Sequence, residues 1–467
     1  MLADATALAE AISGGRLSSK EAMQASLEAA TVAADLGSIA YLDAEKGLSS
    51  ADKIDSLPRE ALKAMPFAGV PSLAKDLGGP FAGFPVTAGS ALMTRRGGLI
   101  DSDLAERFRA AGLCVFGLTT SPEFGLSLSS EPAVGPVARN PLAPHLSAGG
   151  SSGGAAAAVA AGIVSIAHAT DAGGSIRVPA ACCGLFGMKP SRGLMPAGPH
   201  FGNHLGGIAT ELAICRSVRD TAAILTALSG NARGPFPPVA LQSAPQQSLR
   251  IGVLSETGTD LPTTSERSEV VEEAARFLQA AGHRLVPIPF TTIEAVAETS
   301  RRAFVEIVCI NLAETFTRFD LDAGRTEVLT QAVIERGLQI SARSLWQSLN
   351  AMVLVSRDLW RLFDEIDCLL SPILSSAPLP IGSFPSNHTD TDLHFHRMAA
   401  LAPLAALANA SGFPALTLPF GADADGLPLP VQIMAPMGAE ALLLQLAGSL
   451  EQDGRWQHPF PIAGWPA

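Results

Sequence analysis

The chain has 467 residues, of which 47% are hydrophobic, so it can bury a large core in one large domain or in two that pack closely. Asp and Glu total 44 against 32 Lys and Arg, which gives a net charge of −12 without any basic cluster. This balance argues against nucleic acid as a partner.

The amino terminus, MLADATALAE, carries Asp4 and Glu10 where a secretory signal would have positive charge and then an unbroken apolar run. The most apolar stretch, Ala155 to Ala169, is shorter than the roughly 20 residues that span a bilayer, and it predicts a buried helix and strand. The six cysteines include no CxxC pair and are too sparse for a disulfide framework. We therefore expect a cytoplasmic protein with reduced cysteines.

In chain order, the first element is a helix that begins at Ser18, because Ser18 and Glu21 have the spacing of a capping box. The run FAGVPSLAKDLGG, from residue 67, is typical of a strand followed by a loop. A helix followed by a buried strand is then predicted over residues 103–119, and this rhythm recurs at 218–228 and 270–287. Alternation of this kind predicts a layered α/β fold.

Two clusters of Gly and Ser are the unusual feature of the sequence: SAGGSSGGAAAAVAAG over residues 147–162, and TDAGGSIRVPA over residues 170–180. A flexible linker is not usually followed by an apolar run such as AAAAVAAGIVSIA. A phosphate-binding loop would carry GxxxxGK[ST], which is absent. From composition alone, a structural tight turn remains an alternative to a site in which backbone N–H groups approach a bound group closely.

Position and order favour a site. A lysine in GVPSLAKD (Lys75), then GGSSGG (with Ser151), then DAGGSIRVPA (with Ser175) together resemble the amidase signature family. TSPEFG, RNP and CGLFGMKPSRG are further family landmarks, and the resemblance covers roughly residues 60 to 450. Within the family, EPAVGPVARNP and TDAGGSIRVPA are most similar to bacterial amidases of the nylon-oligomer cyclic-dimer hydrolase type.

The resemblance implies an α/β/α sandwich around one large twisted mixed sheet. We expect residues 1–60 to be a helical segment packed on the core and residues 61–467 to be the amidase domain. Within that domain, residues 230–248 are rich in Pro, Gln and Ser and predict a surface linker. Residues 250–400 are the divergent part and are expected to shape the substrate pocket.

The resemblance also implies the chemistry, which is hydrolysis of a carboxylic amide. Ser175 attacks the amide and forms an acyl-enzyme, while Ser151, which follows a cis peptide bond in the family, passes the proton to Lys75. The lysine must be neutral to accept a proton, so its pKa has to lie below the free value of about 10.4, as burial would cause.

The supporting residues follow from the same motif. An oxyanion hole is expected from the backbone N–H groups of Ala172, Gly173, Gly174 and Ser175. Ser152 is expected to support the relay, and Asp171 and Arg177 to hold the loop as an ion pair.

The predicted pocket is mainly apolar and includes Phe124, Gly125 and Cys309, with Phe304 and residues 200–205 as further candidates. The expected partners are a small-molecule amide and water, with neither nucleic acid nor a membrane, and a homodimer is allowed for. We predict no cofactor and no metal, because the tight histidine pair, His394 and His396, lacks ligand spacing.

Three alternatives remain open. Ser72 and Lys75 also spell SxxK, the β-lactamase pattern, although neither SDN nor KTG follows. The A subunit of the tRNA-dependent amidotransferase shares the triad but usually has glutamine where this chain has Val178. A binding module without activity on the same fold would not need the intact triad.

Overall fold

The computed structural model describes residues 3–93, 97–198, 205–229, 241 and 248–465. Eleven strands form one sheet, in the order β1-β3-β2-β6-β8-β7-β12-β13-β11-β9-β10, and β4 and β5 form a separate pair. The large sheet is mixed, since β2 is parallel to β3 and β6 whereas β8 is antiparallel to β6. The strands are β1 (Ile39–Leu42), β2 (Pro71–Lys75), β3 (Cys114–Thr119), β4 (Arg139–Asn140), β5 (Ala143–Ser147), β6 (Ile166–Asp171), β7 (Phe186–Lys189), β8 (Thr210–Cys215), β9 (Arg250–Val253), β10 (Arg284–Pro287), β11 (Cys368–Ser371), β12 (Ala415–Ala422) and β13 (Pro428–Met434).

Fifteen α-helices surround the sheet in the described residues. They are α1 (Ala5–Ser13), α2 (Ser19–Val32), α3 (Ala44–Asp55), α4 (Arg59–Lys63), α5 (Asp103–Ala110), α6 (Gly153–Ala160), α7 (Arg177–Cys182), α8 (Val218–Leu228), α9 (Ser265–Ala280), α10 (Glu294–Arg318), α11 (Val328–Gln339), α12 (Ala342–Phe363), α13 (Thr391–Leu401), α14 (Ala405–Ser411) and α15 (Glu440–Gln452).

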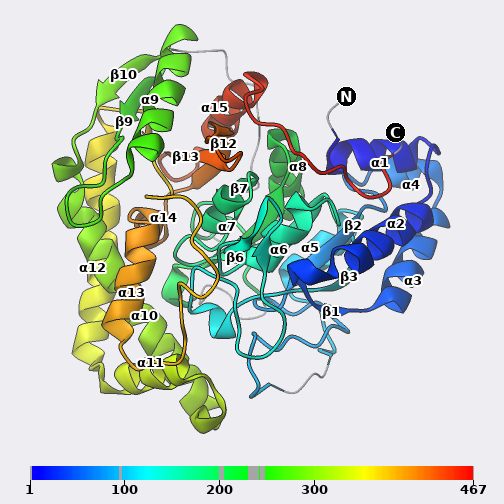
Figure 1. The fold of residues 1–467 in the computed structure, drawn as a ribbon, viewed down its shortest axis with the longest axis horizontal. Coiled ribbons are helices and arrows are strands. Elements are labelled where there is room, and N and C mark those ends of the chain that lie inside the picture. The colour runs from blue at the N-terminus through cyan, green and yellow to red at the C-terminus, as the bar shows by residue number, and fades with distance from the viewer. Residues whose placement is uncertain (1–2, 94–96, 199–204, 230–240, 242–247, 466–467) are drawn as a thin grey trace.

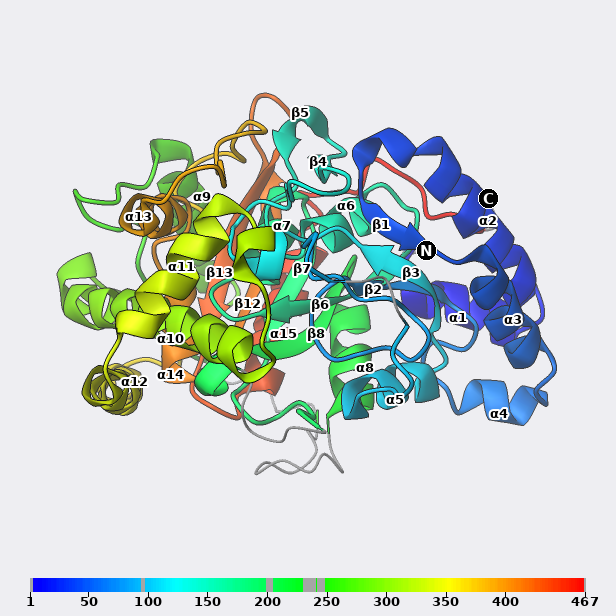
Figure 2. The same cartoon turned by 90° about the horizontal axis from the view of Figure 1, so that it is seen from below.

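The helices are grouped by sequence. Helices α1 to α4 pack at one end of the molecule, where both termini lie, and α9 to α14 pack at the other end (Figures 1 and 2). The long helices α10 and α12 contact each other, and α12 lies at the outer edge in both views. The predicted α/β/α sandwich around one mixed sheet is confirmed.

Local signals placed several elements correctly. Ser18 caps α2 in a complete capping box with Glu21, and the strand predicted before the KDLGG loop is β2. The predicted helix-to-strand unit at 103–119 is α5 followed by β3, whereas the unit predicted at 218–228 is the helix α8 alone, without a strand in that range. Helix α9 begins at Ser265, before the predicted position, because Ser265, Glu266 and Arg267 extend it by a polar turn.

The first 60 residues contribute more than helices. Strand β1 pairs antiparallel with β3 and extends the large sheet at its edge. A strand of four residues leaves too little alternation for its sequence to predict it. The surface linker predicted over residues 230–248 lies almost entirely outside the described residues.

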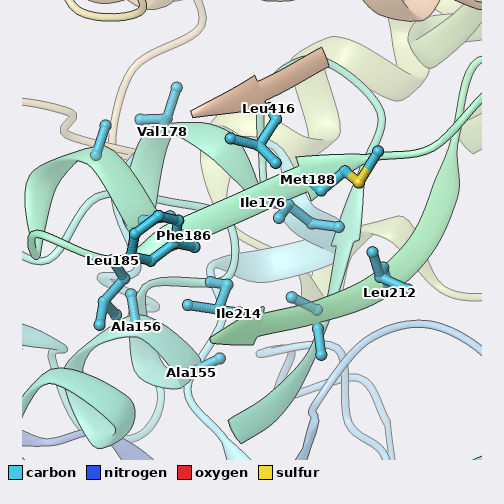
Figure 3. Packing of buried hydrophobic residues seen from close by; sticks show 14 of the residues in the cluster. Ala155, Ala156, Ile176, Val178, Leu185, Phe186, Met188, Leu212, Ile214 and Leu416 are labelled. Carbon is cyan, nitrogen blue, oxygen red and sulfur yellow. The ribbon is translucent and has the colours of Figure 1, made fainter. Parts of the chain in front are cut away.

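The core beside the Gly-Ser clusters is built from small and medium apolar side chains. Ala155 and Ala156 of α6 lie near Ile214 of β8, and Leu185 and Phe186 complete this part of the cluster (Figure 3). Alanine allows α6 to approach the strands closely, since its side chain adds little thickness between helix and sheet. The apolar stretch from Ala155 to Ala169 is therefore a buried helix and strand, as predicted.

None of the helices in the described part of the chain combines the length and the apolar character that crossing a membrane requires.

Candidate active site

Lys75 and Ser151 are in direct contact. Lys75 is the last residue of β2, and its Nζ donates to Ser151 Oγ at 2.8 Å. Ser151 precedes α6, and the Gly150–Ser151 peptide is cis, as the resemblance implies. A side chain at Gly150 would meet the backbone of Leu128 and Ser129, so only glycine fits there.

The Lys75 side chain is buried, with 1% of the residue exposed. Besides Ser151, its Nζ contacts Thr170 Oγ1 at 2.8 Å. Burial lowers the pKa of Lys75 to about 7, while the carboxylates of Asp171 and Glu211 act in the opposite direction. A substantial part of the lysine is therefore neutral near neutral pH.

Ser175 lies in the loop between β6 and α7, and Asp171 organises that loop. The Asp171 carboxylate accepts the N–H of Gly174 at 2.8 Å and of Ile176 at 3.2 Å, and it pairs with Arg177 at 3.0 Å. Burial alone would raise the pKa of Asp171, but the charge and hydrogen bonds of Arg177 outweigh it and lower the pKa. This is the arrangement expected of a pair that holds the loop.

Ser152 also contacts the end of β6. Its Oγ lies 3.3 Å from both the backbone N and the backbone O of Thr170. Since Thr170 Oγ1 contacts the lysine amine, Ser152 supports the residue that sits beside Lys75.

The four backbone donors of the predicted oxyanion hole are not equivalent. The N–H of Gly174 is engaged by Asp171, as described above, whereas no acceptor among the described residues is bonded to the N–H groups of Ala172, Gly173 and Ser175. A Cβ at Gly173 would meet the Phe304 ring at 2.6 Å. Of the four predicted donors, Ala172, Gly173 and Ser175 remain available to a ligand.

Ser151, Ser175 and Thr170 open onto one cavity of about 460 Å³. Its walls are mostly apolar, and Glu211 is the one charged side chain among the described residues that line it. Helices α10 and α13, the 3₁₀ turn η2 (Glu123–Gly125) and the loop after β2 supply much of the apolar wall, which includes Leu77, Phe124, Leu126, Phe304, Val308, Leu312, Phe395 and Met398.

The predicted pocket residues have different outcomes. Phe124, Gly125 and Phe304 line the cavity, and so does Leu205, whereas residues 200–204 lie outside the described residues. Cys309 does not line it, which corrects the prediction. Its side chain is fully buried, and its carbonyl oxygen faces Gly337 of α11.

The described residues contain no group of three or more His, Cys, Asp or Glu side chains placed to hold a metal ion. His394 makes a hydrogen bond instead, since its Nε2 lies 2.6 Å from the carbonyl oxygen of Leu126. Burial lowers the pKa of His394 to about 4. The neutral imidazole therefore supports a wall of the cavity.

Ser72 is turned away from Lys75. Its hydroxyl donates to the carbonyl oxygen of Ile166 at 2.8 Å, and the residue is fully buried. This hydrogen bond connects β2 to β6, so the serine of the SxxK pattern has a structural role.

Three residues at the site were not predicted from the sequence: Thr170, His168 and Glu211. Thr170 directly precedes the DAGGS motif, and this neighbouring position is the sequence signal that could have identified it. His168 and Glu211 come next to Lys75 only through the pairing of β2, β6 and β8, for which no sequence signal exists.

A buried lysine bonded to one serine, and a second serine in a glycine-flanked loop on the same cavity, form the candidate active site. The chain belongs to the amidase family, whose model, described as Amidase, matches residues 21–444. It is an amide hydrolase.

Similar proteins are amidases and amide hydrolases by name. The chain is 33% identical over 473 residues to the "Putative amidase AmiC" of Mycobacterium tuberculosis H37Rv, covering 97% of this chain and 95% of that protein. It is 32% identical over 481 residues to the 6-aminohexanoate-cyclic-dimer hydrolase of Paenarthrobacter ureafaciens, with the same coverage.

Among solved structures, the chain is similar to 6-aminohexanoate cyclic dimer hydrolase complexed with substrate. The TM-score is 0.89 and the identity 30%, and 98% of each chain is covered. A bacterial aryl acylamidase of the amidase signature family has the same fold, with a TM-score of 0.86, 24% identity and 99% coverage of each chain.

Proposed function

We propose that this amidase forms an acyl-enzyme on Ser175, with Ser151 and Lys75 as the proton relay. The observation that carries the proposal is the 2.8 Å contact between Lys75 Nζ and Ser151 Oγ, on the cavity that Ser175 also lines. A serine hydroxyl is a weak nucleophile until a base takes its proton, and a buried lysine with a pKa of about 7 is such a base.

In the acylation step, Ser175 Oγ attacks the amide carbon, and its proton moves to Ser151 Oγ as the Ser151 proton moves to Lys75. The oxyanion is stabilised by the free N–H groups of the 172–175 loop. The C–N bond then breaks, and the relay returns the proton to the departing nitrogen. Water attacks the ester in the same manner, which releases a carboxylic acid and restores Ser175.

The substrate class follows from the cavity. Its mostly apolar walls favour an amide with aliphatic or aromatic substituents, and a volume of about 460 Å³ favours a small molecule. Glu211 is the charged residue that lines the cavity, and its carboxylate would repel a substrate that carries a carboxylate. We therefore propose neutral linear or cyclic amides, a class that includes the substrate named for the relative from Paenarthrobacter.

The test is a panel of neutral, carboxylate-bearing and ammonium-bearing amides, with amine or ammonia release measured for the parent and for Ser175→Ala. The neutral amides should be hydrolysed by the parent alone. In addition, mass spectrometry after a rapid quench should locate the acyl group on Ser175. Acylation of any other residue, or turnover by Ser175→Ala, contradicts the mechanism.

We also propose that the enzyme acts in a reducing compartment such as the cytoplasm, which is supported by six free cysteines, all of them buried. Thiol titration of the unfolded enzyme, purified without reductant, should give six free thiols, and a disulfide would contradict this proposal.

A homodimer is part of the same proposal. Helix α12 exposes Trp346, Val353 and Trp360 at intervals of one heptad. In a twofold antiparallel pair centred on Val353, Trp346 would lie against Trp360 of the second copy, and the exposed Arg343 would lie near the second copy's Asp364. Light scattering should give a dimer for the parent and a monomer for Val353→Glu; a parent monomer contradicts this assembly.

A further inference from the structure

One pair of buried side chains holds both ends of the segment that carries Lys75. The backbone N–H of Lys75 donates to His168 Nδ1 at 3.2 Å, and the backbone N–H of Gly79 donates to Glu211 Oε1 at 2.9 Å. His168 Nε2 and Glu211 Oε2 lie 3.5 Å apart. The pair thus connects the first residue of the KDLGG loop to its last.

The pairing of β6 and β8 creates this arrangement. Thr170 lies opposite Glu211 in the antiparallel register, and side chains on one face recur at every second residue. His168, Thr170 and Glu211 therefore share one face of the sheet, whereas Leu212 and Ile214 lie in the apolar cluster of Figure 3. The same face thus supplies contacts to the backbone of Lys75 and, through Thr170, to its amine.

The hydrogen bond from Lys75 also fixes the tautomer of His168. Because Nδ1 accepts from the Lys75 N–H, the proton of the neutral imidazole is on Nε2, which faces Glu211. The ring is fully buried, and its centroid lies 5.2 Å from that of Phe81 and 6.2 Å from that of Phe108. Aromatic packing therefore holds the imidazole in the orientation that both contacts need.

The charged groups that act on the Lys75 amine are Asp171 and Glu211, both of which raise its pKa against the effect of burial. Asp171 is compensated by Arg177 at 3.0 Å and also shapes the Ser175 loop. Replacing Asp171 would disturb that loop, so Glu211 is the carboxylate whose charge can be removed with the loop intact.

Asp76 follows Lys75 directly, but successive residues of a strand point to opposite faces. Its carboxylate accepts the backbone N–H of Thr87 at 2.6 Å and contacts the hydroxyl of the same residue. Asp76 therefore anchors the 87–89 turn.

We propose that His168 and Glu211 are positioning residues for Lys75: they hold the backbone at Lys75 and at Gly79, and the Glu211 carboxylate acts on the lysine amine through its charge. The proposal rests on the proposed function, in which Lys75 is the base. It goes beyond that function by assigning the pH response of the enzyme to a second residue.

The test is the pH profile of kcat/KM for a neutral amide, measured for the parent and for Glu211→Gln. Glutamine keeps the size of the side chain and an oxygen for the Gly79 N–H, but it removes the negative charge. Since that charge favours the protonated amine, the acidic limb should move to lower pH by about 1 unit. A purely structural role would change the plateau and leave the limb in place.

Glu440→Gln is the matched control. Glu440 is also a buried carboxylate that accepts a backbone N–H, from Ser191 at 2.8 Å, and it acts on Lys189 rather than on Lys75. The acidic limb of the Glu440→Gln variant should stay within about 0.2 pH units of the parental limb. A limb that stays in Glu211→Gln, or one that moves in Glu440→Gln, overturns the proposal.

Lys75→Ala, measured in parallel, separates this proposal from the proposed function. If Lys75→Ala loses the limb while Glu211→Gln keeps the parental one, Lys75 is the base and the tuning role of Glu211 is wrong. If Lys75→Ala keeps both limb and rate, the proposed function itself is wrong.

His168 provides a second, independent test. His168→Gln retains an acceptor for the Lys75 N–H, whereas His168→Leu leaves that buried donor without a partner. At a temperature at which both variants are fully folded, the plateau of kcat/KM should fall roughly tenfold or more in His168→Leu and be largely restored in His168→Gln. Equal plateaus in these two variants contradict the positioning role of His168.

Discussion

The rate of amide hydrolysis should depend on pH through a single acidic limb near pH 7. Burial lowers the pKa of Lys75 from its ordinary value of 10.5 to about 7. That difference corresponds to a net cost of about 5 kcal/mol for protonating the buried lysine, at 1.36 kcal/mol per pKa unit. Roughly half of the enzyme has a neutral Lys75 at pH 7, compared with about one molecule in 2,500 for a lysine of pKa 10.4, so burial raises the active fraction about a thousandfold.

The direction of the limb follows from the neutral lysine being the active form. Below pH 7, kcat/KM should fall about tenfold for each pH unit, and above pH 8 it should be flat. The assay is amine release from a neutral amide between pH 5 and pH 9, in buffers of constant ionic strength. Lys75→Ala should lose the limb and most of the rate, and Lys75→Arg should be no better because arginine stays charged.

Lys189 is the control that this experiment needs. It is fully buried as well, burial lowers its pKa to about 7, and its Nζ donates to the carbonyl oxygen of Pro190 at 2.6 Å. It is not among the residues that line the cavity. Lys189→Met should therefore keep the limb. A limb that survives in Lys75→Ala, or that disappears in Lys189→Met, refutes the assignment of the base.

Four further predictions follow from the site. Ser175→Ala should lower kcat by a factor on the order of 10⁴ or more in the amine-release assay, with an unchanged melting temperature, because it removes the nucleophile alone. Ser152→Ala should cost less than about tenfold in the same assay, since its contacts to Thr170 are long, at 3.3 Å. Arg177→Met should destabilise the protein by about 3–5 kcal/mol in urea unfolding, because it leaves a buried carboxylate unpaired; a loss below 1 kcal/mol would contradict this. Dialysis against EDTA should leave the rate unchanged, given that the described residues group no set of metal ligands, and activity that returns only with added zinc would show the opposite.

Features set by neighbouring residues could be predicted from the sequence. The Ser18 capping box, the helix at 218–228 and the strand before Lys75 depend on contacts within a few residues. The proposed catalytic residues were predicted from the order of the motifs and the family resemblance. Residue type alone does not predict them, because a single lysine or serine is usually an ordinary surface residue.

Features set by the orientation of a helix or by strand register could not be predicted. Cys309 was assigned to the pocket, but successive residues on a helix are rotated by about 100°. Val308 and Leu312 of α10 line the cavity, whereas Cys309 does not, and its carbonyl oxygen lies against Gly337 of α11. In the same way, the proximity of His168 to Glu211 depends on the register of β6 against β8, which the sequence does not specify locally.

The two faces of β8 have different contacts, one with the apolar core and the other with the candidate site. Leu212 and Ile214 anchor the strand in the apolar core, and Glu211 lies between the cavity and the segment of Lys75. A rigid sheet suits the relay, because the proton moves only if Lys75 and Ser151 keep hydrogen-bond distance. The substrate-facing wall comes instead from α10 and α13, which lie beyond the sheet in the divergent part of the chain. This separation implies that substitutions on α10 should change KM among amide substrates and leave the acidic limb where Lys75 sets it, whereas removing the charge of Glu211 on β8 should move the limb itself.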